Sequence, residues 1–155
     1  MNILKSLTWD NYFLNLCYTV SEKSKDPSTK VGSVIVYPDH GICSTGFNGF
    51  PRGVEDNEER YNNRPLKYKI VVHAEANAIL NAAFHGHKTD GCTLYVPWHP
   101  CTECTKKIIQ AGITEVVMDP DYPMSESLKD RWKDDHDIAS MMFNEAKVKV
   151  RMGVK

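Results

Sequence analysis

The chain has 155 residues, of which 19 are lysine or arginine and 20 are aspartate or glutamate, so its formal net charge is −1. This length favours a single domain over residues 1–155, large enough to bury a core without disulfide bonds. The nearly equal numbers of acidic and basic residues argue against the basic surface that nucleic-acid binders need, so a small-molecule substrate is favoured over a nucleic acid.

The first half of the chain predicts a helix, a β-hairpin and a loop. An amphipathic helix is expected over residues 8–23, where apolar residues recur at helical spacing. These residues are Trp9, Tyr12 or Phe13, Leu16 and Val20. Two β-rich runs at 31–37 and 41–47 flank a group of turn residues and predict a hairpin. Residues 51–69 are too polar for a core element, so we expect a loop that is either solvated or covers a substrate.

The second half predicts helices that alternate with strands. Helix-favouring runs cover 74–83 and 102–110, and Gly112 is well placed to end the second of them. Strands are expected at 93–97 and 114–118. Because a helix separates these two strands, they should pair in parallel.

The last part of the chain predicts one more helix and an edge strand. The helix is expected over 133–145, with apolar side chains turned inward, and residues 147–150 alternate like an edge strand. The inward residues would be Ile138, Met141, Met142 and Phe143. Together the elements predict an α/β fold, a three-layer α/β/α sandwich around a mixed five-stranded sheet, with a site at the end of the strand that leads to Cys101.

Two short motifs, His73-Ala74-Glu75 and Pro100-Cys101-Thr102-Glu103-Cys104, predict a hydrolytic zinc site. One imidazole and two thiolates supply the three protein ligands of an open zinc site. We therefore predict His73, Cys101 and Cys104 as ligands of one zinc ion per chain. Glu75 would move protons at the water that the metal activates. His73 and Cys101 each open a predicted helix, whose positive end favours thiolate over thiol.

Two other interpretations of these residues stay open. Cys101 and Cys104 could form a redox dithiol, but His73 and Glu75 would then have no role. A closed structural zinc would need a fourth ligand, and the remaining cysteines and histidines form no second metal-binding pair. The other three cysteines are expected to be core thiols. These are Cys17, Cys43 and Cys92.

In these motifs the chain resembles the cytidine deaminase superfamily, and most closely its deoxycytidylate (dCMP) deaminase branch. The resemblance covers nearly the whole chain. The segments that carry it are residues 24–32, 46–53, 73–79, 100–104 and 109–113. It implies a zinc-dependent hydrolysis of dCMP to dUMP and ammonia that supplies the dTMP pathway. It also implies a homohexamer activated by dCTP and inhibited by dTTP, with Mg²⁺ accompanying the triphosphate.

The resemblance further implies roles for residues outside the metal motifs. Substrate contacts would come from four residues, namely Ser24, Asn48, Asn77 and Tyr122. Gly49 and Arg52 are the candidate effector residues, because a glycine permits close backbone approach and an arginine can reach a phosphate. His99 stands where many members have an aromatic residue, and Trp98 is the candidate to replace that residue.

Several alternatives remain at this stage. A cluster of basic residues is either a solvated surface or a phosphate-binding group, and consists of Arg52, Arg60, Arg64, Lys67 and Lys69. The chain could also be a deaminase that edits tRNA or single strands, or a non-catalytic module stabilised by zinc. No signal peptide or membrane-spanning run is evident, and five cysteines suit a reducing compartment, so we expect a cytoplasmic protein with no membrane partner.

Overall fold

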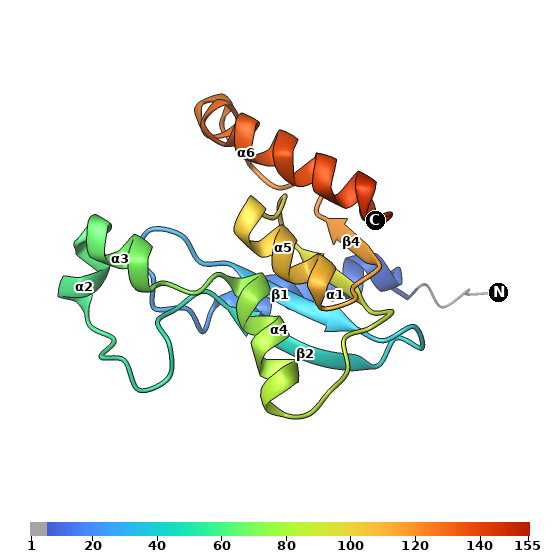
Figure 1. Ribbon diagram of the computed structural model, residues 1–155, viewed down its shortest axis with the longest axis horizontal. Coiled ribbons are helices and arrows are strands. Elements are labelled where there is room, and N and C mark those ends of the chain that lie inside the picture. Colours follow the sequence, from blue (N-terminus) through green and yellow to red (C-terminus); the bar gives the residue numbers. More distant parts are fainter. Residues whose placement is uncertain (1–5) are drawn as a thin grey trace.

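A computed structural model describes residues 6–155, so residues 1–5 of the expected single domain lie outside the described part (Figure 1). Five strands form one sheet in the order β2-β1-β3-β4-β5. The strands are β1 (Gly32–Val36), β2 (Ile42–Phe47), β3 (Thr93–Val96), β4 (Glu115–Met118) and β5 (Lys149–Met152). Strand β1 runs antiparallel to β2 and β3, whereas β3, β4 and β5 are parallel. The predicted mixed sheet, its parallel pair and the edge position of the last strand are therefore confirmed.

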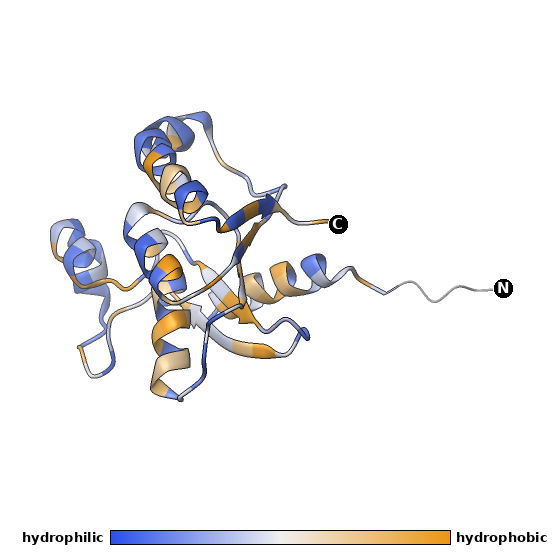
Figure 2. Cartoon of the chain, turned by 45° about the vertical axis from the view of Figure 1, so that its right-hand side comes forward, coloured by the Kyte–Doolittle hydropathy of each residue, from blue (hydrophilic) through white to orange (hydrophobic). Residues whose placement is uncertain are grey.

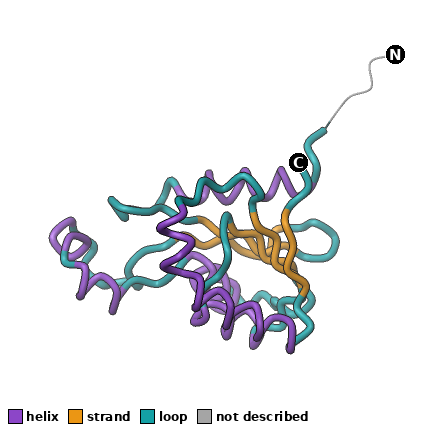
Figure 3. Tube along the Cα trace, turned by 90° about the horizontal axis from the view of Figure 1, so that it is seen from above, coloured by secondary structure: helices purple, strands orange, loops and turns teal. Residues whose placement is uncertain are grey.

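Helices lie on both sides of this sheet (Figure 3). They are α1 (Trp9–Ser21), α2 (Glu58–Asn62), α3 (Arg64–Ile70), α4 (Ala74–Phe84), α5 (Thr102–Gln110) and α6 (Glu126–Glu145). Helix α1 shares one apolar cluster with the sheet, while α4, α5 and α6 contribute to another. The predicted three-layer sandwich is confirmed. None of the helices within residues 6–155 combines the length and apolar content that a membrane crossing requires.

The central strand β1 shows how the sheet serves both layers. All five of its residues are buried, as expected for a strand covered on both faces. Val34 and Val36 pack with α1, whereas Ile35 packs on the opposite face with the cluster that includes α4 and α5. Figure 2 shows apolar residues on the strands and on the sheet-facing helices. The three lone cysteines are buried in these clusters, which confirms their prediction as core thiols.

Two glycines let helices approach the sheet closely. A Cβ at Gly32 would lie 2.0 Å from the Cys17 carbonyl oxygen in α1, and a Cβ at Gly46 would lie 2.2 Å from the Ala78 nitrogen in α4. No side chain larger than hydrogen fits at such distances. Helix α4, which begins beside the metal motif, is thus held against the backbone of β2.

Residues 51–69 are not the predicted loop, because helices α2 and α3 occupy much of the segment. Asn57 caps α2 by accepting a hydrogen bond from the Arg60 backbone N–H at 3.0 Å, and Asn63 caps α3 in the same way through Leu66. Tyr61 is buried and stacks on Phe50, with ring centroids 4.2 Å apart. Local capping and this one aromatic contact outweigh the polar composition from which a loop was predicted.

Helix α6 begins at Glu126, capped by Ser125, rather than at the predicted residue 133. Its inward face also differs from the prediction. Ile138 and Met141 are each 51% exposed. Phe143 is buried as predicted, and Ala139 is buried as well, because α6 packs on α5 along a single narrow face.

Candidate metal centre and cavity

The two helices that carry the metal motifs start at the predicted ligands. His73 is the N-cap residue of α4 and Cys101 is the N-cap residue of α5, and both have extended backbone. Neither side chain caps its own helix. Strand β3 leads through a short segment to Cys101, so the sheet fixes where α5 begins. As a result, both side chains are available to each other rather than to the helix ends.

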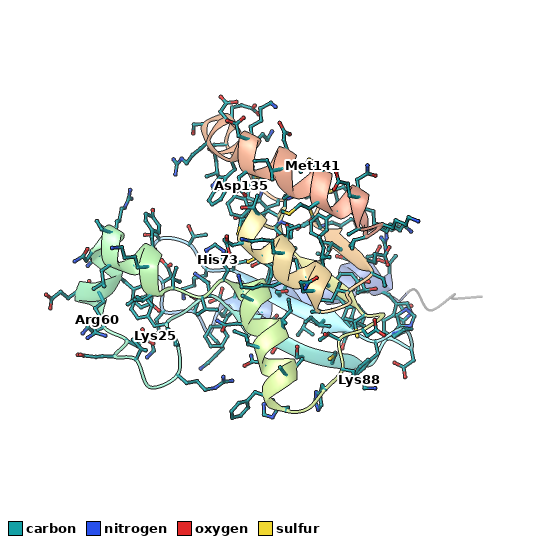
Figure 4. All side chains as sticks on the ribbon, viewed as in Figure 1. Lys25, Arg60, His73, Lys88, Asp135 and Met141 are labelled. Carbon is teal, nitrogen blue, oxygen red and sulfur yellow. The ribbon has the colours of Figure 1, made fainter. Side chains whose placement is uncertain are left out.

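The predicted ligand atoms converge. His73 Nδ1 lies 3.4 Å from Cys101 Sγ and 3.6 Å from Cys104 Sγ. The three donor atoms all lie within 4.8 Å of one another. A tetrahedral zinc ion with its usual bond lengths would separate nitrogen from sulfur by about 3.6 Å. The donor set therefore fits a zinc ion in type, number and spacing. Figure 4 labels His73 where α4 begins.

Among the three donors, the pKa shifts favour negative charge on Cys101 alone. A hydrogen bond from Cys104 lowers the pKa of the Cys101 thiol to about 4, against the opposing effect of burial, and His73 adds to the lowering. The same contact, followed by burial, raises the pKa of Cys104. The hydrogen bond with Cys101 raises the pKa of His73. A thiolate next to an imidazole is a favourable partner for a cation.

Glu75 lies beside the donors without being one of the three. It is only 4% exposed, and its Oε2 is 3.7 Å from Cys104 Sγ. Burial raises the pKa of the Glu75 carboxyl. A buried carboxyl next to the donor group is placed to accept and release protons there, as a general acid–base must.

The end of α5 at the metal is capped by a residue from α6. The Asp135 carboxylate accepts hydrogen bonds from the Thr102 backbone N–H at 2.9 Å and from the Thr102 hydroxyl at 2.8 Å. Asp135 therefore caps α5, because the side chain of Cys101, the N-cap residue, makes no capping hydrogen bond. The sequence analysis missed this residue, because α6 was predicted from its apolar spacing alone. Asp135 is labelled in Figure 4.

A cavity of about 310 Å³ opens beside the metal motif. Its lining includes an aromatic group in which Trp98 lies next to Tyr122 and Trp132, with ring centroids 5.7 and 5.8 Å apart. His136 stacks on Trp132, and burial lowers the pKa of its imidazole, which keeps this wall uncharged. A flat heterocycle could stack on such a wall. Trp98 comes from the loop after β3, Tyr122 from the segment between β4 and α6, and Trp132 and His136 from the middle of α6.

Comparison with known proteins identifies the family. Residues 7–119 match the family model described as the cytidine and deoxycytidylate deaminase zinc-binding region. The chain belongs to this deaminase family. It is 39% identical over 152 residues to human deoxycytidylate deaminase, covering 94% of this chain and 79% of that protein. It is also 39% identical to an uncharacterized deaminase of Aliivibrio fischeri, covering 92% of this chain and 91% of that one.

Solved structures show that the fold is shared. The dCMP deaminase of cyanophage S-TIM5 in apo form superposes with a TM-score of 0.69 at 24% identity, covering 92% of this chain and 95% of that one. The cytidine deaminase-like fold predicted from the sequence is thereby confirmed.

The deaminase cavity includes two of the four predicted substrate residues. Asn48 and Tyr122 line it, whereas Ser24 and Asn77 are not among its lining residues. The Ser24 hydroxyl donates to the Asn48 carbonyl oxygen at 2.7 Å, and Asn77 Nδ2 donates to the Phe47 carbonyl oxygen at 2.7 Å. Both bonds hold the backbone that follows β2. These hydrogen bonds favour a role for Ser24 and Asn77 in supporting the cavity wall rather than in contacting the substrate.

Asn48 itself is engaged within the chain. Its Oδ1 accepts from the Val31 backbone N–H at 2.8 Å, and its Nδ2 donates to the Thr29 carbonyl oxygen at 2.9 Å. Next to it, Lys67 Nζ of α3 pairs with the Asp26 carboxylate at 2.8 Å, with both side chains largely buried. This ion pair ties α3 to the segment before β1 and thereby fixes one wall of the cavity.

The two candidate effector residues lie outside the cavity lining. Gly49 exchanges backbone hydrogen bonds with Val72, at 3.1 and 2.8 Å, immediately before the metal motif. The Arg52 guanidinium lies 4.6 Å from the centre of the Phe84 ring and donates to Asn81. Both contacts are with segments flanking or within α4. The assignment of these residues to an effector site stays a prediction.

Proposed function

We propose that this chain catalyses the zinc-dependent hydrolysis of dCMP to dUMP and ammonia. The observation that carries the proposal is the buried Glu75 carboxyl, 3.7 Å from Cys104 Sγ within a His/Cys/Cys donor group beside an aromatic cavity. Support for dCMP comes from relatives named deoxycytidylate deaminase, and from the cyanophage enzyme whose structure was solved with dCMP and dUMP.

Each residue of the motifs has a role in this proposal. His73, Cys101 and Cys104 hold the zinc, which when bound supplies Lewis-acid activation of water at neutral pH. Glu75 takes one proton from the water and delivers it to the N3 nitrogen of the pyrimidine ring. It then takes the second proton from the hydroxyl formed at C4 and passes it to the amino group, so that the C4–N bond breaks, the C4=O bond forms and ammonia leaves. The aromatic wall holds the ring against this proton donor, so the reacting carbon and the water meet in a fixed orientation.

The proposal extends to regulation and assembly. We propose a cytoplasmic homohexamer, activated by dCTP and inhibited by dTTP with Mg²⁺ accompanying the triphosphate, as the family resemblance implies. Large apolar side chains on the surface support an oligomer: Leu80 and Phe84 of α4 are 51% and 69% exposed. Five free cysteines support a reducing compartment.

The test follows ultraviolet absorbance while zinc-loaded protein meets dCMP, cytidine or a short single strand that contains cytosine. We expect dCMP to be deaminated most efficiently. In Glu75→Gln, kcat should fall by at least about a hundredfold, because the proton transfer is lost, while zinc content and circular dichroism stay unchanged. Glu59→Gln, an exposed change in α2, serves as the matched control.

Two results would contradict the proposal. Preferential turnover of the single strand would favour an editing deaminase of the same fold. Absence of turnover in the wild type, with zinc bound, would favour a non-catalytic module.

A further inference from the structure

The cavity is lined by two arginines that are not engaged elsewhere. Arg64 begins α3 and Arg131 lies in the first half of α6, and both are exposed lining residues. Within residues 6–155, neither guanidinium forms an ion pair or a hydrogen bond with another side chain. Neighbouring basic residues are engaged, since Arg60 pairs with Glu55 at 3.2 Å and Lys67 pairs with Asp26 at 2.8 Å.

These two arginines come from elements far apart in the sequence. In Figure 1, α3 and the N-terminal end of α6 both lie on the left-hand side of the view, to the left of α5. Ser28 and Thr29, from the segment before β1, also line the cavity. Two guanidinium groups and two hydroxyls thus come from three separate segments around one opening.

Acidic and basic side chains are not evenly distributed along the cavity. Among the described residues that line it, Glu75 is the one carboxylate, and it lies at the metal end. An anion next to the arginines would meet no competing carboxylate there. Guanidinium groups form paired, charge-assisted hydrogen bonds with phosphate oxygens, and an arginine without an existing partner gives up no ion pair to do so.

We propose that Arg64 and Arg131 together bind the 5′-phosphate and make this site prefer a nucleoside monophosphate over the nucleoside. The proposal rests on the deaminase function proposed above. The base would lie on the aromatic wall with its amino group towards Glu75, and the phosphate would lie between α3 and α6. The basic residues singled out in the sequence thus have different roles. Arg64 binds the substrate, whereas Arg60 and Lys67 form ion pairs within the protein.

The test compares dCMP with deoxycytidine in Arg64→Gln, Arg131→Gln and the double variant. We expect each single variant to raise KM for dCMP about tenfold or more, and the double variant to raise it further, because a charge-assisted hydrogen bond is lost each time. The kcat for dCMP, and kcat/KM for deoxycytidine, should stay within about twofold of the wild type. Arg60→Gln is the matched control and should leave both substrates unaffected.

A second measurement needs no dCMP turnover. Inorganic phosphate should compete with dCMP for binding to the Glu75→Gln protein, because both would occupy the phosphate subsite, and should compete much less when both arginines are changed. Calorimetric binding of dCMP to Glu75→Gln protein, with and without the two arginine changes, provides the same comparison if the wild type proves inactive. That comparison separates failure of this proposal from failure of the deaminase function.

Three outcomes would overturn the phosphate-binding pair. One is an unchanged preference for dCMP over deoxycytidine in the double variant. Another is an equal loss for both substrates, which would mean that the arginines only support the fold. The third is arginine-dependent turnover of a single strand in preference to dCMP, which would assign the pair to a nucleic-acid backbone.

Discussion

Asp10 is a buried carboxylate in the first turn of α1 that joins distant parts of the chain. It accepts hydrogen bonds from the Tyr95 hydroxyl at 2.9 Å and from the Val154 backbone N–H at 2.9 Å, and it forms an ion pair with Arg151. Burial alone would raise the pKa of Asp10, but these donors, Arg151 foremost, lower it to about 2. The folded state therefore favours the ionised carboxylate.

This shift predicts an acid-sensitive contribution to stability. Because the folded pKa of Asp10 lies below its unfolded value, the contribution is complete above about pH 5 and disappears as the pH falls from about 4 to about 2. We expect Asp10→Asn to lower the free energy of unfolding by about 2 kcal/mol at pH 7. In urea titrations across this pH range, the wild-type and variant values should converge towards pH 2. A constant difference would contradict the prediction.

For individual side chains, the sequence predicted the metal-binding and proton-transfer residues better than the residues that hold them in place. His73, Glu75, Cys101 and Cys104 lie in two short motifs whose residue types define a zinc site by themselves. The partners of buried carboxylates carry no such local signal. Asp10 meets Arg151 across 141 positions, and Asp26 meets Lys67 across 41. Only the folded chain brings those pairs together.

Among the elements, α5 depends on α6 for its N-terminus. Cys101 occupies the N-cap position of α5 but its sulfur faces His73, so the backbone N–H of Thr102 is satisfied by Asp135 instead. A metal ligand and a helix cap would otherwise compete for one side chain. The cap also restrains the first turn of α5, which contains Cys104.

Removing this cap should weaken both the helix and the metal site. We expect Asp135→Ala to lower the free energy of unfolding by about 1 kcal/mol and zinc affinity by about tenfold, because an outer residue that orients a ligand is lost. Chelator competition measures the affinity and urea titration the stability. Asp134→Ala, at the exposed neighbouring position, is the control. Equal zinc affinities in the two variants would contradict the role of Asp135.

The elements that the sequence mispredicted also involve helix caps. Ser125, Asn57 and Asn63 each cap a helix that the sequence analysis missed or began too late. The capping residues were visible in the sequence, but residues 51–69 were predicted from their polar composition and α6 from its apolar spacing. By contrast, α1, the hairpin and the alternation from α4 to β4 were predicted correctly, because their apolar periodicity and turns agree. The inward face of α6 was predicted only in part, at Phe143, because its buried residues depend on where α5 lies.

For the molecule as a whole, the metal donors join two helices of the same layer. A zinc ion held by His73 of α4 and by two cysteines of α5 would stabilise the folded state, because it would bind that state in preference to the unfolded chain. We expect chelation to lower the midpoint of thermal unfolding by several degrees, and added zinc to restore it. Metal analysis should return one zinc per chain. A midpoint insensitive to chelation, or two zinc ions per chain, would contradict this prediction.

The close approach of α4 to β2 at Gly46 has a consequence for how the family can diverge. At Gly46 the main chains of β2 and α4 are in contact, with no side chain between them. Substitutions elsewhere in the apolar core therefore leave the distance between α4 and the sheet unchanged. His73 and Glu75 lie at the start of α4, so their distance from the sheet is fixed as well. Core composition can therefore drift over evolutionary time while the reacting groups keep their positions.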